Sequence, residues 1–289
     1  MKFKHVIFTR FNLQYDFGSD LHIQSAWLDE RFRLFEQYCF PSIMGQTNLQ
    51  FTWVILSSNQ TPDLYKNRLS SYVQSYPNIQ IEYCAYFEDV NVLYKVMGDK
   101  YVEENDFLLS TRIDSDDMFA ADFVAVLQTY VQTYLNTEAI ISFQNGIQWF
   151  EKAEMAFAVS FPKNHFLSFL EHQHNIRTCL GMDHTKVSEQ TLVLLDNTAM
   201  WCEIVHGNNI CNGYTPAYHY SRCVVNSGAF PTQMPVYHAL RQYLFIMKEY
   251  LRFRYRQLGR GLRKLVGRHN SWLDWSTKCI ELIQIWLFL

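Results

Sequence analysis

The most informative part of the sequence is Phe107-Leu108-Leu109-Ser110-Thr111-Arg112-Ile113-Asp114-Ser115-Asp116-Asp117. It begins as an apolar run and ends in three carboxylates within four positions. A strand of a parallel sheet can be apolar along its length because helices cover both faces of the sheet. Closely spaced carboxylates repel one another unless a cation or a hydrogen-bond donor neutralises them. The stretch therefore predicts a central strand that delivers Asp114 and Asp116 to the carboxyl edge of a sheet, where open α/β sheets bind ligands.

Two interpretations of the acidic end remain open at this point. The first is a site for a hard divalent ion, which proteins often hold with one or two carboxylates, waters and substrate phosphates. The second is a helix start, at which Ser115 or Asp117 is the capping residue and the positive end of the helix favours acids. An EF-hand loop is excluded, because Met118 and Phe119 stand where that loop needs Asp or Asn and then Gly.

The composition is that of a globular protein. The chain has 289 residues, of which 48% are hydrophobic and 16% aromatic, and this excludes wholesale disorder. Seven cysteines are scattered without a Cys-x-x-Cys pair, which argues against a zinc signature and against a disulfide scaffold. Residues 1–8 contain too short an apolar run for a signal peptide. We therefore expect a cytoplasmic protein with reduced, mostly buried thiols.

Strand and helix patterns alternate along the first half of the chain. Such alternation predicts a parallel sheet covered by helices, and no linker interrupts residues 1–230. The expected strands span residues 4–10, 51–56, 79–84 and 139–143, besides the strand at residue 107 and a strand-like run at 200–206, and the expected helices span residues 26–40, 61–73, 90–104, 122–135 and 164–172.

The charge is distributed unevenly between the two ends of the chain. Residues 1–240 carry 15 Lys and Arg against 25 Asp and Glu, whereas residues 241–289 carry 10 against 3. Basic and apolar residues interleave over residues 241–268, a pattern typical of a basic amphipathic helix on a membrane surface. We therefore divide the chain into a domain at 1–230 and a basic amphipathic helical tail at 231–289.

Other interpretations of the tail are a helix packed on its own domain and a homodimer contact. The last apolar run, at 279–289, is too short and interrupted to span a bilayer. Nucleic acid is not an expected partner, because the body is acidic and carries no recognition motif.

Three motifs follow or precede expected strands. They are Thr9-Arg10-Phe11-Asn12, the run from Pro41 to Thr47 that leads into Phe51–Leu56, and Arg112–Asp117. Together they resemble the GT-A glycosyltransferases, a nucleotide-sugar-binding fold with an Asp-x-Asp metal motif. More narrowly, the chain is similar to bacterial rhamnosyltransferases over residues 5–210. The supporting residues are Trp27-Leu28-x-x-Arg31, Leu34-Phe35-Glu36-x-Tyr38-Cys39-x-Pro41-Ser42-Ile43, Thr111-Arg112-Ile113-Asp114 and Trp201-x-x-x-Val205-His206-Gly207-x-Asn209.

The resemblance implies an α/β, GT-A-like fold, with a mostly parallel central sheet covered by helices and a C-terminal basic helical extension. It also implies that Asp114 and Asp116 hold Mg²⁺ or Mn²⁺ against the pyrophosphate of a nucleotide-sugar donor. Oxygen ligands favour these ions over zinc. A late histidine often completes such a site in this fold, and His206 is the candidate. The alternative for His206 is a strand residue that bonds a backbone partner.

Further residues are expected to contact the donor. Arg10 and Arg112 can pair with phosphate bidentately, although an ion pair with an acid is an equally good interpretation of each. In this fold the second strand usually ends in an Asp that contacts the nucleoside, and Ser57, Ser58 and Asn59 stand there instead. The expected donor-binding residues are Thr9, Arg10, Asn12, Ser57, Asn59, Arg112 and Asp114.

An inverting transfer needs one carboxylate to take the proton of the acceptor hydroxyl. The candidates are Glu171, Asp183 and Glu203. Asp183 is favoured because it lies in an expected loop, where catalytic groups are often found. Glu171 closes an expected helix, where a solvated position is the alternative. We expect Asp117 to cap the next helix or to position the donor sugar.

The predicted function is a metal-dependent, inverting glycosyltransferase that moves a sugar such as rhamnose from a nucleotide-diphosphate donor. The expected acceptor is a glycan or a lipid-linked saccharide, at the inner face of the plasma membrane. The alternative is a non-catalytic GT-A-like scaffold or carbohydrate-binding protein, suggested by the missing acid after the second strand. Another Mg²⁺-dependent phosphoryl transferase is less consistent, because the chain has no phosphate-cradling glycine-rich loop.

Overall fold

The protein is described here by a computed structural model, in which contacts divide the chain into two compact units. The first unit comprises Met1–Asn209 and Tyr218–Val236, and the second comprises Ile210–Ala217 and Tyr237–Leu289. The predicted division at residue 230 stays a prediction. The structure describes residues 2–14, 20–85, 106–172, 176–188, 192–195, 198–207, 209, 213–215, 218–222, 229–232 and 239–266.

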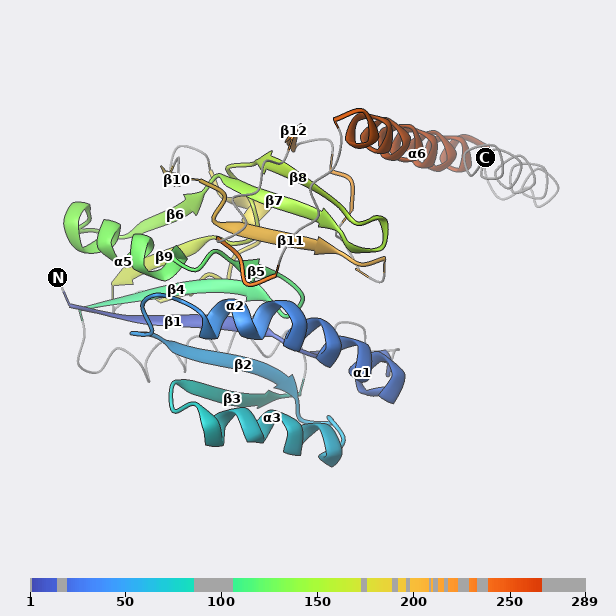
Figure 1. The fold of residues 1–289 in the computed structure, drawn as a ribbon. Helices are drawn as coiled ribbons and strands as arrows, with labels where there is room; N and C mark the ends of the chain where they lie inside the picture. The colour runs from blue at the N-terminus through green and yellow to red at the C-terminus, as the bar shows by residue number, and fades with distance from the viewer. Residues whose placement is uncertain are drawn as a thin grey trace. The chain divides into compact units, whose positions relative to one another are not determined.

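A seven-stranded sheet forms the centre of the first unit (Figure 1). Its strands are β1 (Phe3–Arg10), β2 (Thr52–Ser58), β3 (Ile79–Cys84), β4 (Phe107–Asp114), β6 (Ala139–Phe143), β9 (Ser168–His172) and β10 (Leu192–Leu195). Their order is β10-β6-β9-β4-β1-β2-β3. All neighbours are parallel except β9, which is antiparallel to β4 and β6. The predicted α/β class with a mostly parallel sheet is confirmed.

The central strands are buried because their residues are apolar on both faces. Every residue of β2 is buried, and the indole of Trp53 donates a hydrogen bond of 2.9 Å to the hydroxyl of Thr9 in β1. His5 is also buried and bonds the hydroxyl of Thr111 at 2.9 Å. Polar groups inside this sheet thus find partners on the neighbouring strand, as burial requires.

The predicted helix after β1 is present and longer than expected. It consists of α1 (Ser25–Leu34), a π-helical turn (Phe35–Cys39) and α2 (Phe40–Met44) in one continuous run. Pro41 lies directly beyond the π-helical turn, inside this continuous helical run. Phe35 packs on Trp53, with ring centroids 5.6 Å apart, and so holds the helix on the sheet.

Two other predicted helices are confirmed, as α3 (Asp63–Ser75) and α5 (Phe123–Tyr134). The helix predicted at 164–172 is wrong, because Ser168–His172 forms β9 instead. Four of its five residues are buried between β4 and β6. A short apolar run fits the periodicity of a helix and of a strand equally well, and here it forms a strand. The helix predicted at 90–104 lies outside the described residues.

A second sheet follows the acidic stretch. It contains five strands in the order β12-β8-β7-β11-β5. They are β5 (Met118–Phe119), β7 (Asn145–Phe150), β8 (Met155–Ser160), β11 (Trp201–Val205) and β12 (His219–Arg222). Because β5 begins directly after Asp117, the acidic stretch is the connection between the two sheets. Of this sheet, the sequence predicted only the strand at 200–206.

The second unit contains the predicted basic helix, α6 (Ala239–Val266). Among the described residues, no helix combines the length and the apolar character needed to cross a membrane. The thiol prediction holds for the cysteines that the structure describes with their side chains. These are Cys39, Cys84, Cys179 and Cys202, which are all buried and form no disulfide with one another.

A glycine in the second sheet makes room for a buried tryptophan. Gly146 lies opposite Trp201, whose ring would be 2.2 Å from an added Cβ. We expect Gly146→Ala to lower the free energy of unfolding by about 3 kcal/mol, because the fully buried ring has no space to move. Chemical denaturation measures this change. Gly213→Ala is the control, since nothing lies within 4 Å of its added Cβ, and equal losses in both variants would contradict the assignment.

Candidate functional site: an acidic turn among arginines

Asp114 ends β4 between two arginines. Arg10 pairs with it in register from the parallel strand β1, and Arg112 lies two residues earlier on the same face of β4. Nη2 of Arg10 lies 2.9 Å from Oδ1, and Nη2 of Arg112 lies 2.9 Å from Oδ2. Burial alone would raise the pKa of Asp114, but the two guanidinium charges outweigh it and hold this pKa well below its usual range. Both arginines are therefore ion-paired with an acid, which is one of the two interpretations offered for them from the sequence; the other was a contact to phosphate.

Asp116 is a buried anion held by three elements. Its Oδ2 lies 2.9 Å from Nε2 of His206 and 3.2 Å from Nη1 of Arg31 in α1. Asn209 donates to the same oxygen at 3.4 Å. Gly207 has φ of +88°, a left-handed conformation that suits glycine and lets the chain return Asn209 to Asp116. Burial opposes ionisation of Asp116, but Arg31 and His206 lower its pKa.

Asp117 has a different environment, without an arginine hydrogen bond. Its Oδ1 accepts a hydrogen bond of 2.9 Å from the backbone N–H of Ile204, and its Oδ2 lies 3.0 Å from Nε2 of His165. Complete burial, and then the charges of Asp116 and Asp114, raise its pKa well above the usual range.

The prediction that Asp117 or Ser115 caps a helix is wrong. The strand β5 follows Asp117, and α5 begins later, at Phe123, after an N-cap residue that makes no side-chain cap. The side chain of Asp117 instead fixes β11 through Ile204.

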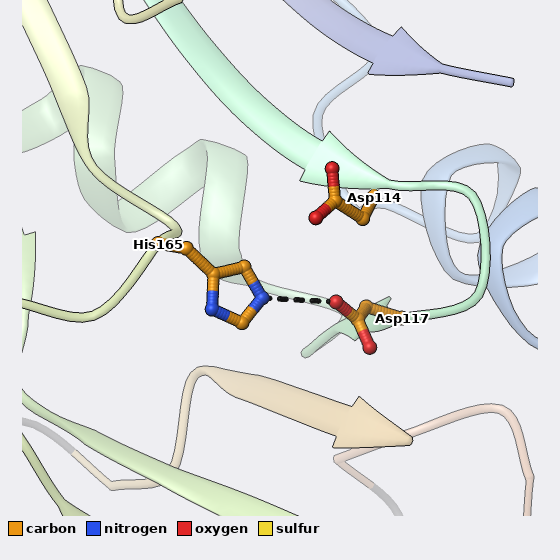
Figure 2. A group of neighbouring side chains, drawn as sticks. All are labelled: Asp114, Asp117 and His165. Carbon is orange, nitrogen blue, oxygen red and sulfur yellow. Dashed lines mark hydrogen bonds and ion pairs between the residues drawn. The ribbon is translucent and has the colours of Figure 1, made fainter. Parts of the chain in front are cut away.

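Three side chains at this turn are close enough to share a metal ion. Asp114, Asp117 and His165 each offer a ligand atom, and these atoms lie within 4.8 Å of one another (Figure 2). Two carboxylates and one imidazole fit a divalent ion, and the nitrogen favours Mn²⁺ over Mg²⁺, which takes oxygen ligands. Within the described part of the chain, no other group of three such residues has this spacing. The structure thus joins Asp116 to His206, whereas Asp114 is grouped with Asp117 and His165. The predicted ligand set stays a prediction.

The polar residues expected to bind the nucleoside have partners of their own. Asn12 donates to the hydroxyl of Thr61 at 2.8 Å and accepts from the hydroxyl of Ser57 at 2.7 Å. Thr9 accepts from the Trp53 indole in the core. Asn59 is exposed just beyond β2. The structure therefore places Asn59 on the surface and the other three inside hydrogen-bonded networks, and their donor contacts stay predictions.

The candidate bases lie in contrasting environments. Glu171 is buried in β9, and its two oxygens accept from the backbone N–H groups of Arg177 at 3.0 Å and Thr178 at 2.7 Å. Burial raises its pKa despite these bonds. Asp183 is exposed and accepts from the N–H and hydroxyl of Thr185, which lower its pKa.

The loop of Asp183 lies beside the acidic turn. The ring of the next residue, His184, lies 6.1 Å from the ring of His165, which in turn bonds Asp117. A hydrogen bond of 2.7 Å between His184 and the carbonyl of Lys163 fixes this arrangement. The structure thus brings Asp183 near the turn, and its role as base stays a prediction.

Glu203 is the third candidate and lies deepest. It sits opposite Gln148 in the second sheet, and the amide of Gln148 donates to it at 2.8 Å. Burial raises the pKa of Glu203 to about 7, and the charge of Asp117 adds to this effect. His165, Gln148 and Tyr218 oppose the shift but do not cancel it.

Some residues of the site were not among the predicted site residues. Arg31, Asn209 and His165 all contact the acidic turn. The motif Trp27-Leu28-x-x-Arg31 and the motif ending at Asn209 contained a signal for two of them. Nothing local distinguishes His165.

A family model described as "Putative rhamnosyl transferase" matches residues 19–218, about two thirds of the chain and all three acids of the turn. The chain belongs to this family. It is therefore a member of a glycosyltransferase family, and the predicted resemblance is confirmed. No curated protein sequence matches the chain.

Several solved structures of S. aureus TarS are similar to part of this chain at low identity. TarS 1–349 is 11% identical with a TM-score of 0.41, over 71% of this chain and 60% of that one. For the complex of TarS 1–349 with UDP-GlcNAc, the identity is 12% and the TM-score is 0.42, over 73% of this chain and 62% of that one. For the complex with UDP, the identity is 13% and the TM-score is 0.40, over 71% of this chain and 61% of that one. The chain thus spans about three fifths of the length of these structures.

Glu203 gives the fold a specific pH dependence. Its folded-state pKa of about 7 exceeds the ordinary 4.5, so its contribution is fully present below pH 4.5 and is lost as the pH rises through 7. We expect Glu203→Gln to gain about 3 kcal/mol of stability relative to wild type between pH 5 and pH 8. Urea denaturation at several pH values measures the difference. Glu154→Gln, at an exposed position, should show none, and a pH-independent effect of Glu203→Gln would refute the assignment.

Proposed function

We propose that this protein is a metal-dependent, inverting glycosyltransferase. It transfers a sugar, rhamnose or a related hexose, from a nucleotide-diphosphate donor to a glycan or lipid-linked acceptor. The observation that carries the proposal is the group of Asp114, Asp117 and His165 at the carboxyl edge of the sheet, with Arg10 and Arg112 beside it. Family membership supports the reaction class.

The residues that would hold Mn²⁺ or Mg²⁺ are Asp114, Asp117 and His165, in place of the set expected from sequence. Such an ion supplies neutralisation of the charge that develops on the leaving diphosphate. The pair of Asp116 and His206 then acts by holding the turn in position. Their 2.9 Å contact and the buried ion pair to Arg31 support this structural role.

Arg10 and Arg112 are suited to the diphosphate. A guanidinium carries five N–H donors, so each arginine can keep Asp114 and still donate to a phosphate oxygen. Both side chains are partly exposed, at 13% and 14%, which leaves part of each guanidinium accessible to a ligand. The loop of Asp183 lies beside the proposed metal ligands, because the ring of His184 is 6.1 Å from the ring of His165.

Asp183 is the proposed base. In the transfer, the acceptor oxygen forms a bond to the anomeric carbon while the bond from that carbon to the diphosphate oxygen breaks. The acceptor proton passes to Asp183, and the bonding electrons leave with the diphosphate. The low pKa of Asp183 keeps it ionised at neutral pH, and its exposure leaves it accessible to an acceptor. Glu171 is less suited, because both of its oxygens are engaged with backbone N–H groups.

One observation favours a second function, a non-catalytic carbohydrate-binding protein. The polar groups at the end of β2 bond one another through Asn12, Ser57 and Thr61, and no carboxylate stands there for a nucleoside. Such a protein would bind glycans and would not bind nucleoside diphosphates.

Nucleotide binding distinguishes the two functions. We expect UDP, dTDP or GDP at about 100 times its Kd to raise the Tm by roughly 5–10 °C when Mn²⁺ is present, and to have little effect with EDTA. His165→Gln should abolish the metal-dependent part of the shift, because it removes a proposed ligand. His206→Gln is the matched variant and should keep it. The opposite pattern would favour the ligand set predicted from sequence, and no shift from any nucleotide would reject the proposed function.

The role of the base is tested by kinetics. Asp183→Asn should lower kcat about 10²-fold to 10⁴-fold and leave the nucleotide-induced shift of Tm unchanged, because a base acts only on the acceptor proton. Release of nucleoside diphosphate from a panel of nucleotide sugars measures the rate. Glu171→Gln is the comparison variant, and a larger loss of kcat there than in Asp183→Asn would transfer the role to Glu171.

A further inference from the structure

The helix α6 exposes an apolar stripe. At about 100° per residue, six of the seven large apolar side chains described as exposed on this helix fall within an arc of roughly 100°, which also contains Arg254. Their exposed fractions range from 39% to 69%. Soluble surfaces seldom leave this many large apolar groups in one row. The stripe consists of Leu240, Tyr243, Leu244, Met247, Leu251 and Leu258.

A different face of α6 packs within its own unit. The ring of Tyr214 contacts Tyr250 at 6.3 Å and Phe253 at 6.0 Å, and Gln242 is buried at 3% exposure. Gln242 and Phe253 are turned by roughly 130–150° from the centre of the stripe, and Tyr250 lies at its edge, roughly 70° from the centre. The stripe is therefore not the surface that holds the helix in its unit.

Positive charge borders the stripe along its other side. The helix carries eight Lys and Arg and one acid, Glu249, which pairs with Arg252. Around the helix axis, four of the basic residues are turned by roughly 80–160° from the middle of the stripe. Along the axis, they follow one another at intervals of about one to two helical turns. They are Arg241, Lys248, Arg252 and Arg256.

We propose that α6 lies in the plane of an anionic lipid surface, with the stripe inserted among the acyl chains. A helix of 28 residues is roughly 42 Å long, and an apolar arc flanked by cations matches the boundary between headgroups and acyl chains. Anionic headgroups complement the excess of seven positive charges on the helix. A second copy fits less well, because pairing the stripes would bring two strongly cationic helices together. This inference does not depend on the proposed enzymatic activity.

Vesicle flotation of the full-length protein tests the proposal. We expect binding to vesicles of phosphatidylcholine with 30% phosphatidylglycerol to be at least tenfold stronger than binding to phosphatidylcholine alone. Raising NaCl from 100 to 500 mM should weaken it severalfold, because salt screens the headgroup attraction. Equal binding to both vesicles, or binding to neither, would overturn the proposal.

Variants of the stripe separate α6 from the rest of the chain. The double variant Leu244→Ser with Leu251→Ser should bind anionic vesicles at least tenfold more weakly. Gln257→Ser, on the same helix but outside the stripe, is the control and should bind like wild type. Circular dichroism and thermal unfolding confirm that each variant is folded. Unchanged binding by the double variant would overturn the proposal, as would a wild-type dimer that ignores vesicles and becomes monomeric in the variant.

Discussion

The structure depends on the ion pairs that hold two carboxylates of the turn between the sheets. Burying an ionised carboxylate costs several kcal/mol unless a cation and hydrogen bonds compensate it. Asp114 is compensated by Arg10 and Arg112, and Asp116 by Arg31. Each cation arrives on a major element: β1, β4 and α1. The turn can therefore close only when the sheet and its first helix are in place, so folding and site formation are one event.

These ion pairs also change the electrostatic character of the site. Read alone, the acidic motif suggests a strongly negative pocket. In the folded protein, three guanidinium groups surround two carboxylates that they keep ionised, whereas the environment of Asp117 favours its protonated form. The site thus combines oxygen ligands for a cation with donors for an anion. The metal-bound diphosphate of the proposed function would use both kinds of group.

The sequence was sufficient for the features encoded locally and insufficient for those made by distant residues. The strands β1, β2 and β4 were predictable because each is a largely apolar run that ends in polar residues, and β3 because apolar and polar residues alternate along it. The error at Ser168–His172 arose because a short apolar run fits both the helical and the strand periodicity. Its position between β4 and β6 makes it a strand. The role of Asp117 was missed because His165 and Ile204, its partners, lie 48 and 87 residues away. Spacing along the chain does not encode such contacts.

One residue explains why widely separated motifs of this family occur together. Arg31 belongs to the first motif, and His206 and Asn209 belong to the last. All three contact Asp116, so the motifs meet at a single carboxylate. Removing that carboxylate would leave the largely covered Arg31 without its acidic partner and would release the loop that Gly207 turns back toward the site. Asp116 is thus best understood as the junction that fixes α1 and the end of β11 around the turn, and this role requires an acid there because its partners are an arginine, an imidazole and an amide donor.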